Sequence, residues 1–151
     1  MELNINFQTA PKGYFDGLMR TGHYVHNSGL DAKLMELIKV RVSQINGCAF
    51  CLDMHFKDAV HIGETEQRLY SLPAWRDCPY YSEAERAALA FAEEITSIHH
   101  LSKEVTDEME RHYNEIEIAN ITLAIVNINA WNKLNKALQP LAGTYQVGMF
   151  A

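Results

Sequence analysis

Apolar side chains recur every three or four positions along most of this chain, which is the spacing of one face of an α-helix. The stretch after Asp31 shows it well, with apolar residues at Leu34, Leu37, Ile38, Val42 and Ile45. A half-buried strand would instead alternate apolar and polar residues, and we find no convincing run of that kind. The pattern therefore predicts an all-α fold.

The first two helices are delimited by residues that favour helix ends. Pro11 suits a first helical turn, and Gly29 accepts the left-handed conformation that follows a last one. We therefore expect a helix from Pro11 to about Ser28. Asp31 is a good N-cap for the second helix, and Asn46-Gly47 interrupts its apolar pattern.

The middle of the chain is expected to hold one more helix, then a loop, then a fourth helix. The third helix should span residues 48–62 and stop at Gly63. A loop should follow, because the next segment contains Pro73, Trp75 and Pro79. Ser82 with Glu85 three residues later is typical of a capping box, which predicts the start of the fourth helix.

The last part of the chain predicts a short helix and a long one. Thr106 is a candidate cap for a short helix through Met109, and the long helix should span residues 115–138 before Pro140 halts it. Apolar residues cover most of the circumference of this long helix. It should therefore be buried on more than one side, against its own chain or another subunit, and we expect an obligate homo-oligomer.

Composition sets the class of protein. With 151 residues, 48% of them hydrophobic and 21% charged, the chain is expected to form one domain over residues 1–151. A formal charge of −6 without a basic cluster argues against a nucleic-acid partner and against an anionic membrane surface. No apolar run is long enough to span a bilayer. Three cysteines and no recognisable export signal favour the cytoplasm.

Candidate chemistry gathers at two cysteines. Cys48, Cys51 and His55 follow one another at i, i+3 and i+7, so they share one stripe of the third helix. Free N–H groups in a first helical turn favour thiolates, and two thiols at this spacing can close a disulfide. Glu36, on the preceding helix, could reach them if the two helices form a hairpin. Burial beside a thiol would raise the pKa of Glu36 and suit it to carry protons.

The pattern Glu-x11-Cys-x2-Cys-x3-His resembles the carboxymuconolactone decarboxylase superfamily, in particular its alkylhydroperoxidase D-like branch. It stands within Val-Ser-Gln-Ile-Asn-Gly-Cys-Ala-Phe-Cys-Leu-Asp-Met-His. The resemblance implies an all-helical bundle that forms trimers or hexamers. It also implies a peroxidase that reduces hydroperoxides by a thiol cycle and depends on an external thiol reductant. No cofactor and no bound metal are expected.

The same resemblance assigns roles to the residues. Cys51 would attack the peroxide and become a sulfenic acid, Cys48 would condense with it, and Glu36 and His55 would relay protons. The helix dipole alone would favour Cys48 as the more acidic thiol, whereas the nearness of His55 favours Cys51, and we follow the second argument. Peroxidases of this branch carry a further His just before the second cysteine. Here Phe50 stands there, so one relay member is missing.

Other interpretations of these residues stay open. The two cysteines could simply pack in the core, or they could bind zinc together with His55. The chain could also be an oligomer whose thiols do not turn over, or a lyase of the decarboxylase type. Several further polar residues are expected at the surface or between subunits: His23, His26, Lys39, Arg41, Lys57, Asp58, and the asparagines Asn127, Asn129, Asn132 and Asn135. Cys78 is expected to be structural or incidental.

Overall fold

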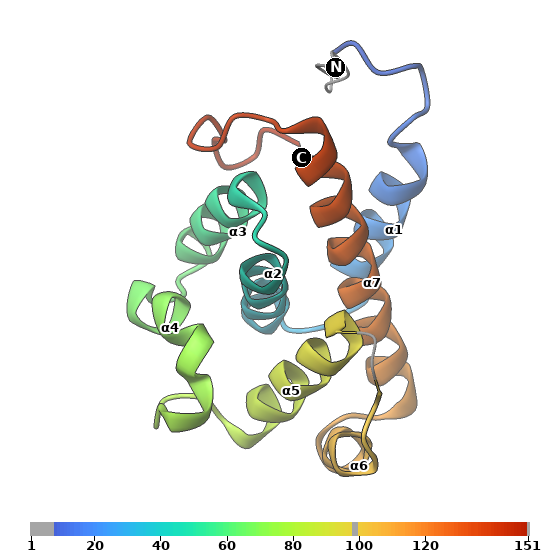
Figure 1. Cartoon of the computed structure of the whole chain (residues 1–151). Helices are drawn as coiled ribbons and strands as arrows, with labels where there is room; N and C mark the ends of the chain where they lie inside the picture. The colour runs from blue at the N-terminus through green and yellow to red at the C-terminus, as the bar shows by residue number, and fades with distance from the viewer. Residues whose placement is uncertain (1–7, 98–99, 151) are drawn as a thin grey trace.

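A computed structural model describes residues 8–97 and 100–150 (Figure 1). Within those residues the chain forms helices and no strand, which confirms the all-α prediction. The elements are α1 (Asp16–His26), α2 (Ala32–Asn46), α3 (Ala49–His61), α4 (Glu66–Ser71), the 3₁₀ helix η1 (Leu72–Asp77), α5 (Glu83–Ser97), α6 (Lys103–His112) and α7 (Glu115–Leu138).

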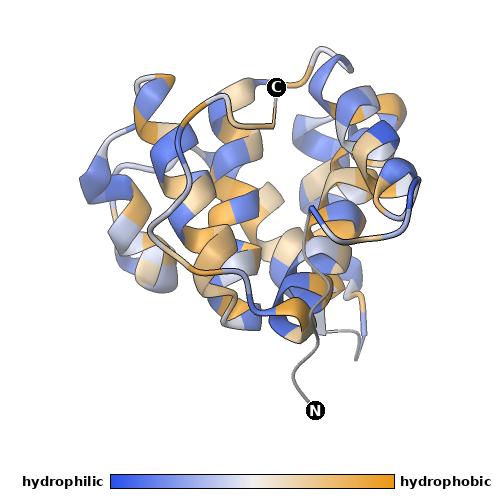
Figure 2. Cartoon of the chain, turned by 90° about the horizontal axis from the view of Figure 1, so that it is seen from above, coloured by the Kyte–Doolittle hydropathy of each residue, from blue (hydrophilic) through white to orange (hydrophobic). Residues whose placement is uncertain are grey.

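Helix α2 is the centre of the bundle and packs against α3, α5 and α7 (Figure 1). Its residues Ile38 and Val42 belong to a core shared with α5 and α7, whereas Leu37 and Val40 belong to a second core shared with α3, α4 and η1. All four side chains are almost fully buried. Figure 2 shows hydrophobic positions gathered where the helices face one another. A functional group carried by α2 is therefore held on a rigid element inside the fold.

The turn between α2 and α3 follows the prediction closely. The Asp31 carboxylate accepts the Leu34 N–H at 2.8 Å and so caps the start of α2. Gly47 ends that helix in the left-handed conformation, with φ of +64°, where a side chain would be strained. Cys48 follows as the N-cap of α3. The tight turn places the start of α3 beside the end of α2.

Two predicted boundaries were wrong. The first helix begins at Asp16 rather than near Pro11, because Gly13 has a φ of +82° and the chain turns there before the helix starts. The short sixth helix is capped by Ser102, whose hydroxyl accepts the Val105 N–H, and not by Thr106. Thr106 lies inside that helix.

The segment after Gly63, which was expected to be a loop, is helical from Glu66 to Asp77, and a loop follows at residues 78–82. Thr65 caps α4 by accepting the Arg68 N–H, and η1 continues from it without a gap. Leu69, Leu72 and Trp75 follow at intervals of three and are all buried in the second core. A spacing of three matches a 3₁₀ helix. The prediction of a loop took the prolines as helix breakers, but Pro73 falls in the first turn of η1, where proline is tolerated.

Helix α7 has the predicted bounds, and a capping box between Asn114 and Glu117 fixes its start. One side of it is buried against α1, α2 and α5. Its outward side still carries exposed apolar residues, with Ile116 exposed by 73% and Val126 by 51%. The helix is therefore buried along one side within this chain, and the rest of its apolar surface faces outward.

The chain after α7 turns back across α3 (Figure 1). The N–H of Gly143 donates to the Asp53 carboxylate at 3.0 Å, and the ammonium of Lys57 donates to the Tyr145 carbonyl at 2.9 Å. These bonds fix the C-terminal segment over the helix that carries the cysteines. Among the described helices, none has both the length and the apolar content needed to cross a membrane.

Candidate active site

Cys48 and Cys51 are joined by a disulfide at the start of α3. Cys48 is the N-cap residue and its sulfur accepts the backbone N–H of Cys51 at 3.3 Å. Both side chains are buried, with Cys51 exposed by only 1%. The local sequence explains the arrangement. The left-handed Gly47 turns the chain from α2 into α3, so that Cys48 lies at the start of α3 and Cys51 lies about one turn later. The pair is thus placed as the spacing predicted.

Glu36 and His55 form a buried pair between α2 and α3. Nδ1 of His55 lies 2.9 Å from Oε2 of Glu36, and the ammonium of Lys39 donates to Oε1 at 2.8 Å. Burial raises the pKa of Glu36, but the charge and hydrogen bond of His55, together with Lys39, outweigh it and lower the pKa to about 2. Our expectation of a raised pKa for Glu36 was therefore wrong, because it considered burial alone and left out the contacts with His55 and Lys39.

The ionised carboxylate of Glu36 fixes the orientation of the imidazole. A carboxylate only accepts hydrogen bonds, so Nδ1 of His55 must carry the proton that joins them. The second ring nitrogen, Nε2, then lies on the opposite side of the ring, away from Glu36. Glu36 in this arrangement is an orienting base for His55 rather than a proton donor.

Cys51 and His55 both line a cavity of about 470 Å³ between α1, α3, α7 and the C-terminal segment. Its walls are mainly apolar and include the aromatic residues Phe50, Trp131, Tyr145 and Phe150. Cys48 is absent from this lining. A second cavity of about 280 Å³ is lined by Glu36 and Asp58. The Glu36–His55 pair therefore lies between the two cavities, with Cys51 on the side of the larger one.

Asp58 and Tyr145 were not predicted to belong to the site. Burial raises the pKa of Asp58, and the Tyr145 hydroxyl donates to its carboxylate at 2.8 Å. Burial, followed by that hydrogen bond, raises the pKa of Tyr145 to about 12. Asp58 was expected on an exposed or intersubunit face, whereas here it lines both cavities. Its position one helical turn after His55 was the only sequence signal available.

A metal ion has one candidate position among the described residues. Ligand atoms of Glu36, His55 and Asp58 lie within 4.8 Å of one another. An ion there would compete with Lys39 for Glu36 and with Tyr145 for Asp58. The zinc set considered from the sequence was different, since it used the sulfurs of Cys48 and Cys51, which are bonded to each other here.

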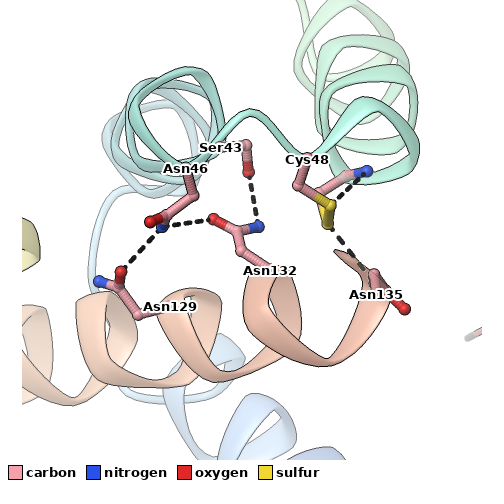
Figure 3. The surroundings of a disulfide bond; sticks show 7 residues. Ser43, Asn46, Cys48, Asn129, Asn132 and Asn135 are labelled. Atoms are coloured by element: carbon pink, nitrogen blue, oxygen red, sulfur yellow. Dashed lines mark hydrogen bonds between the residues drawn. A yellow bond between two sulfur atoms is a disulfide. The ribbon is translucent and has the colours of Figure 1, made fainter. Parts of the chain in front are cut away.

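Asparagines of α7 face the α2–α3 turn, as Figure 3 shows. The Asn132 amide donates to the Ser43 hydroxyl at 3.0 Å and accepts from Asn46 at 3.0 Å. The Asn135 amide N–H donates to the sulfur of Cys51 at 3.4 Å. Asn132 and Asn135 are buried, so the expectation that these asparagines lie at the surface or between subunits was wrong for them.

The remaining polar predictions divide between the site and other places. His23, His26 and Asn127 line the larger cavity. Arg41 is paired with Glu93 at 2.8 Å inside the fold rather than on an exposed face. Cys78 lines neither of the two cavities described above and lies in the loop before α5.

Known proteins resemble this chain in sequence. The sequence model of the carboxymuconolactone decarboxylase family matches residues 12–94, a range that includes Glu36, both cysteines and His55. The uncharacterised protein YdfG of Bacillus subtilis strain 168 is 45% identical over 136 residues, which cover 87% of this chain and 90% of that protein.

Two solved structures share the fold. A protein of unknown function from Agrobacterium tumefaciens, described as a candidate AhpD antioxidant defence protein, superposes with a TM-score of 0.88 at 36% identity. The match covers 93% of this chain and 98% of the other. The debrominase Bmp8 superposes with a TM-score of 0.77 at 25% identity, over 85% of this chain and 70% of its own.

Proposed function

This chain belongs to the carboxymuconolactone decarboxylase family, and we propose that it is a thiol-dependent peroxidase that reduces organic hydroperoxides. Cys48 and Cys51 would cycle between dithiol and disulfide. One observation carries the proposal: Cys51 of the disulfide lines an apolar cavity together with an imidazole that is held by a carboxylate.

The reaction begins with reduced cysteines. The Cys51 thiolate attacks the terminal oxygen of the hydroperoxide, the O–O bond breaks, and the departing alkoxide takes a proton to leave as an alcohol. Cys51 is then a sulfenic acid. The Cys48 thiol condenses with it, water leaves, and the disulfide forms. An external dithiol completes the cycle by thiol–disulfide exchange, so it supplies the two electrons consumed by the peroxide.

Cys51 is assigned as the attacking sulfur because it lines the cavity and Cys48 does not. His55 would take the thiol proton and return it to the departing alkoxide, with Glu36 holding the ring in place. The second cavity, on the Glu36 side, would give water access to this pair. Phe50 makes the pocket wall apolar at the position of the missing relay histidine, which favours substrates with an organic group.

A second candidate reaction is the reductive removal of a halogen from an aromatic ring. It is favoured by the aromatic walls of the cavity and by the shared fold of the debrominase. The dithiol would again supply two electrons: the carbon–bromine bond would be replaced by carbon–hydrogen, bromide would leave, and the disulfide would form. Both reactions thus end in the same oxidised cysteine pair and differ in the product formed.

The proposal includes the assembly of the protein. Both hydrophobic cores use residues of α2, so we treat residues 1–151 as one domain. The exposed Ile116 and Val126 on α7 support an obligate homo-oligomer, a trimer or hexamer, that covers them. Sedimentation of the purified protein as a monomer at micromolar concentration would contradict this. We place the activity in the cytoplasm, where thiol reductants are abundant.

The decisive experiment counts free thiols before and after one equivalent of cumene hydroperoxide. We expect the loss of two thiols, the appearance of cumyl alcohol, and full recovery on addition of a dithiol. Cys51→Ser should abolish peroxide consumption, while Cys78→Ser, a matched change outside the site, should leave it unchanged. Retained turnover in Cys51→Ser would refute the assignment. Lactone decarboxylation that survives alkylation of both site thiols would instead indicate a lyase.

A further inference from the structure

The fold alone does not explain why the amide of Asn135 is buried. Its side chain is exposed by only 5%, and within residues 8–97 and 100–150 its oxygen Oδ1 has no hydrogen-bond partner. Figure 3 shows that oxygen on the side of the amide turned away from the disulfide. A buried carbonyl without a partner costs folding free energy, because the bonds it made to water in the unfolded chain are lost.

Asn132, one turn earlier on the same helix, shows how a structural amide behaves. Its oxygen accepts the Asn46 N–H, and its nitrogen donates to the Ser43 hydroxyl. These bonds tie α7 to the end of α2, and the side chain is fully buried. Asn132 is therefore explained by the fold. Asn135 differs because its amide N–H donates to a sulfur atom.

That contact lies at the reactive atom. Nδ2 of Asn135 is 3.4 Å from the sulfur of Cys51, and both residues line the larger cavity. A disulfide sulfur has no proton to donate, so the amide N–H must be the donor and the carbonyl must point away. When the disulfide is reduced, the same N–H would face a thiolate. Hydrogen bonds to charged groups are stronger than those to neutral ones.

We propose that Asn135 is a catalytic residue whose amide N–H stabilises the Cys51 thiolate, so that the sulfur facing the cavity becomes the nucleophile. Cys48 obtains its own hydrogen bond from the backbone N–H of Cys51 as the helix cap. Asn135, on α7, gives the Cys51 sulfur a hydrogen bond of its own. The inference rests on the proposed function for the step in which Cys51 attacks, but the hydrogen bond itself can be tested without any peroxide.

The test follows the reactivity of Cys51 in a Cys48→Ser background. The rate of alkylation by iodoacetamide is measured from pH 5 to 10 by mass spectrometry of the Cys51 peptide, which separates it from Cys78. With Asn135→Leu we expect the apparent pKa of Cys51 to rise by about one unit, which makes alkylation near neutral pH about tenfold slower. Asn135→Asp keeps the shape but places a carboxylate beside the sulfur, so it should raise the apparent pKa further.

Asn132→Leu is the matched control. It should lower the melting temperature clearly, because it takes the Asn132 partner from the buried Ser43 hydroxyl and removes one of the two acceptors of the Asn46 amide, but it should not shift the pH profile of Cys51. Asn135→Leu should melt at the same temperature as its parent or higher, since it removes a buried oxygen that has no partner. An unchanged pH profile in both Asn135 variants would overturn the proposal. A loss of melting temperature in Asn135→Leu equal to that of Asn132→Leu would overturn it as well.

These outcomes are separate from those of the proposed function. If the wild-type protein consumes no hydroperoxide but Asn135→Leu still shifts the profile, the thiolate assignment stands and the peroxidase assignment fails. If the wild-type protein consumes hydroperoxide but Asn135→Leu does not shift the profile, the peroxidase assignment stands and the thiolate assignment fails.

Discussion

Glu36, which is buried, and Glu93, which is half-buried, are two carboxylates in the same molecule, each held by nitrogen donors of neighbouring side chains. Glu93, on α5, accepts hydrogen bonds from Arg41 at 2.8 Å, Arg76 at 2.7 Å and Trp75 at 3.0 Å. In both, burial raises the pKa and the partners lower it by a larger amount. In the direction of their pKa shifts, the two carboxylates look alike.

The partners and the surroundings separate them. Arginine keeps its proton at every pH of interest, so the group around Glu93 can only hold α5, α2 and η1 together. Histidine exchanges protons near neutral pH, and His55 lines a cavity together with a cysteine. Glu93 lines neither of the two cavities described above. A paired carboxylate therefore indicates a function only when its partner can titrate and has a cavity to act upon.

The largest expected contrast is in catalysis. Glu36→Gln removes the charge that orients His55, and we expect peroxide consumption with a dithiol to fall about 100-fold. Glu93→Gln should leave the rate within about twofold, provided that the protein is folded, because it touches neither the sulfurs nor the cavities. Peroxide loss at saturating dithiol measures both. An unchanged rate in Glu36→Gln would remove the carboxylate from the mechanism.

The second largest effect is expected at low pH, where protonation of Glu36 should destabilise the folded protein. The folded pKa of Glu36 is about 2, against an ordinary value of 4.5. Its stabilisation is therefore complete above about pH 4.5 and disappears as the pH falls through 2, with a total of about 3 kcal/mol. Urea unfolding between pH 2 and 6 should show a steeper loss of stability in the wild type than in Glu36→Gln. Parallel curves would mean that the folded pKa is not lowered.

Stability at neutral pH should reverse the contrast between the carboxylates. Glu93→Gln leaves two arginines short of a counter-charge, and we expect a loss of about 2 kcal/mol in the free energy of unfolding. Urea unfolding at pH 7 measures it. Glu93→Ala would also delete packing and is a poorer probe. A loss below about 0.5 kcal/mol would show that water replaces the carboxylate around Arg41 and Arg76.

Local sequence signals predicted the frame of the site well. Asp31, Gly47 and Gly63 act through their own backbone or cap geometry, so their neighbours in sequence suffice to place the ends of α2 and α3. The disulfide partners are three residues apart and lie on one helix. Helical spacing alone brings them together.

Long-range partners could not be predicted in the same way. Asn135 reaches Cys51 across 84 residues, and Tyr145 reaches Asp58 across 87. Nothing in the spacing of these residues marks them, because their contacts follow from how α7 and the C-terminal segment pack on α3. The prediction for the pKa of Glu36 failed for a related reason. The direction of the shift depends on His55, which comes close to Glu36 only because α2 and α3 form a hairpin.

The smallest expected contrast concerns two tyrosines that make the same kind of bond in different places. Tyr145 donates to Asp58 beside the cavity, and Tyr113 donates to the Ala84 carbonyl at the other side of the bundle, both at 2.8 Å. Replacing either with phenylalanine should cost about 1 kcal/mol of unfolding free energy. Tyr145→Phe alone should also raise the KM for cumene hydroperoxide, by a factor of about three, because the bond fixes a wall of the pocket. Equal KM values in the two variants would show that the C-terminal segment holds its position over α3 through Gly143 and Lys57 alone.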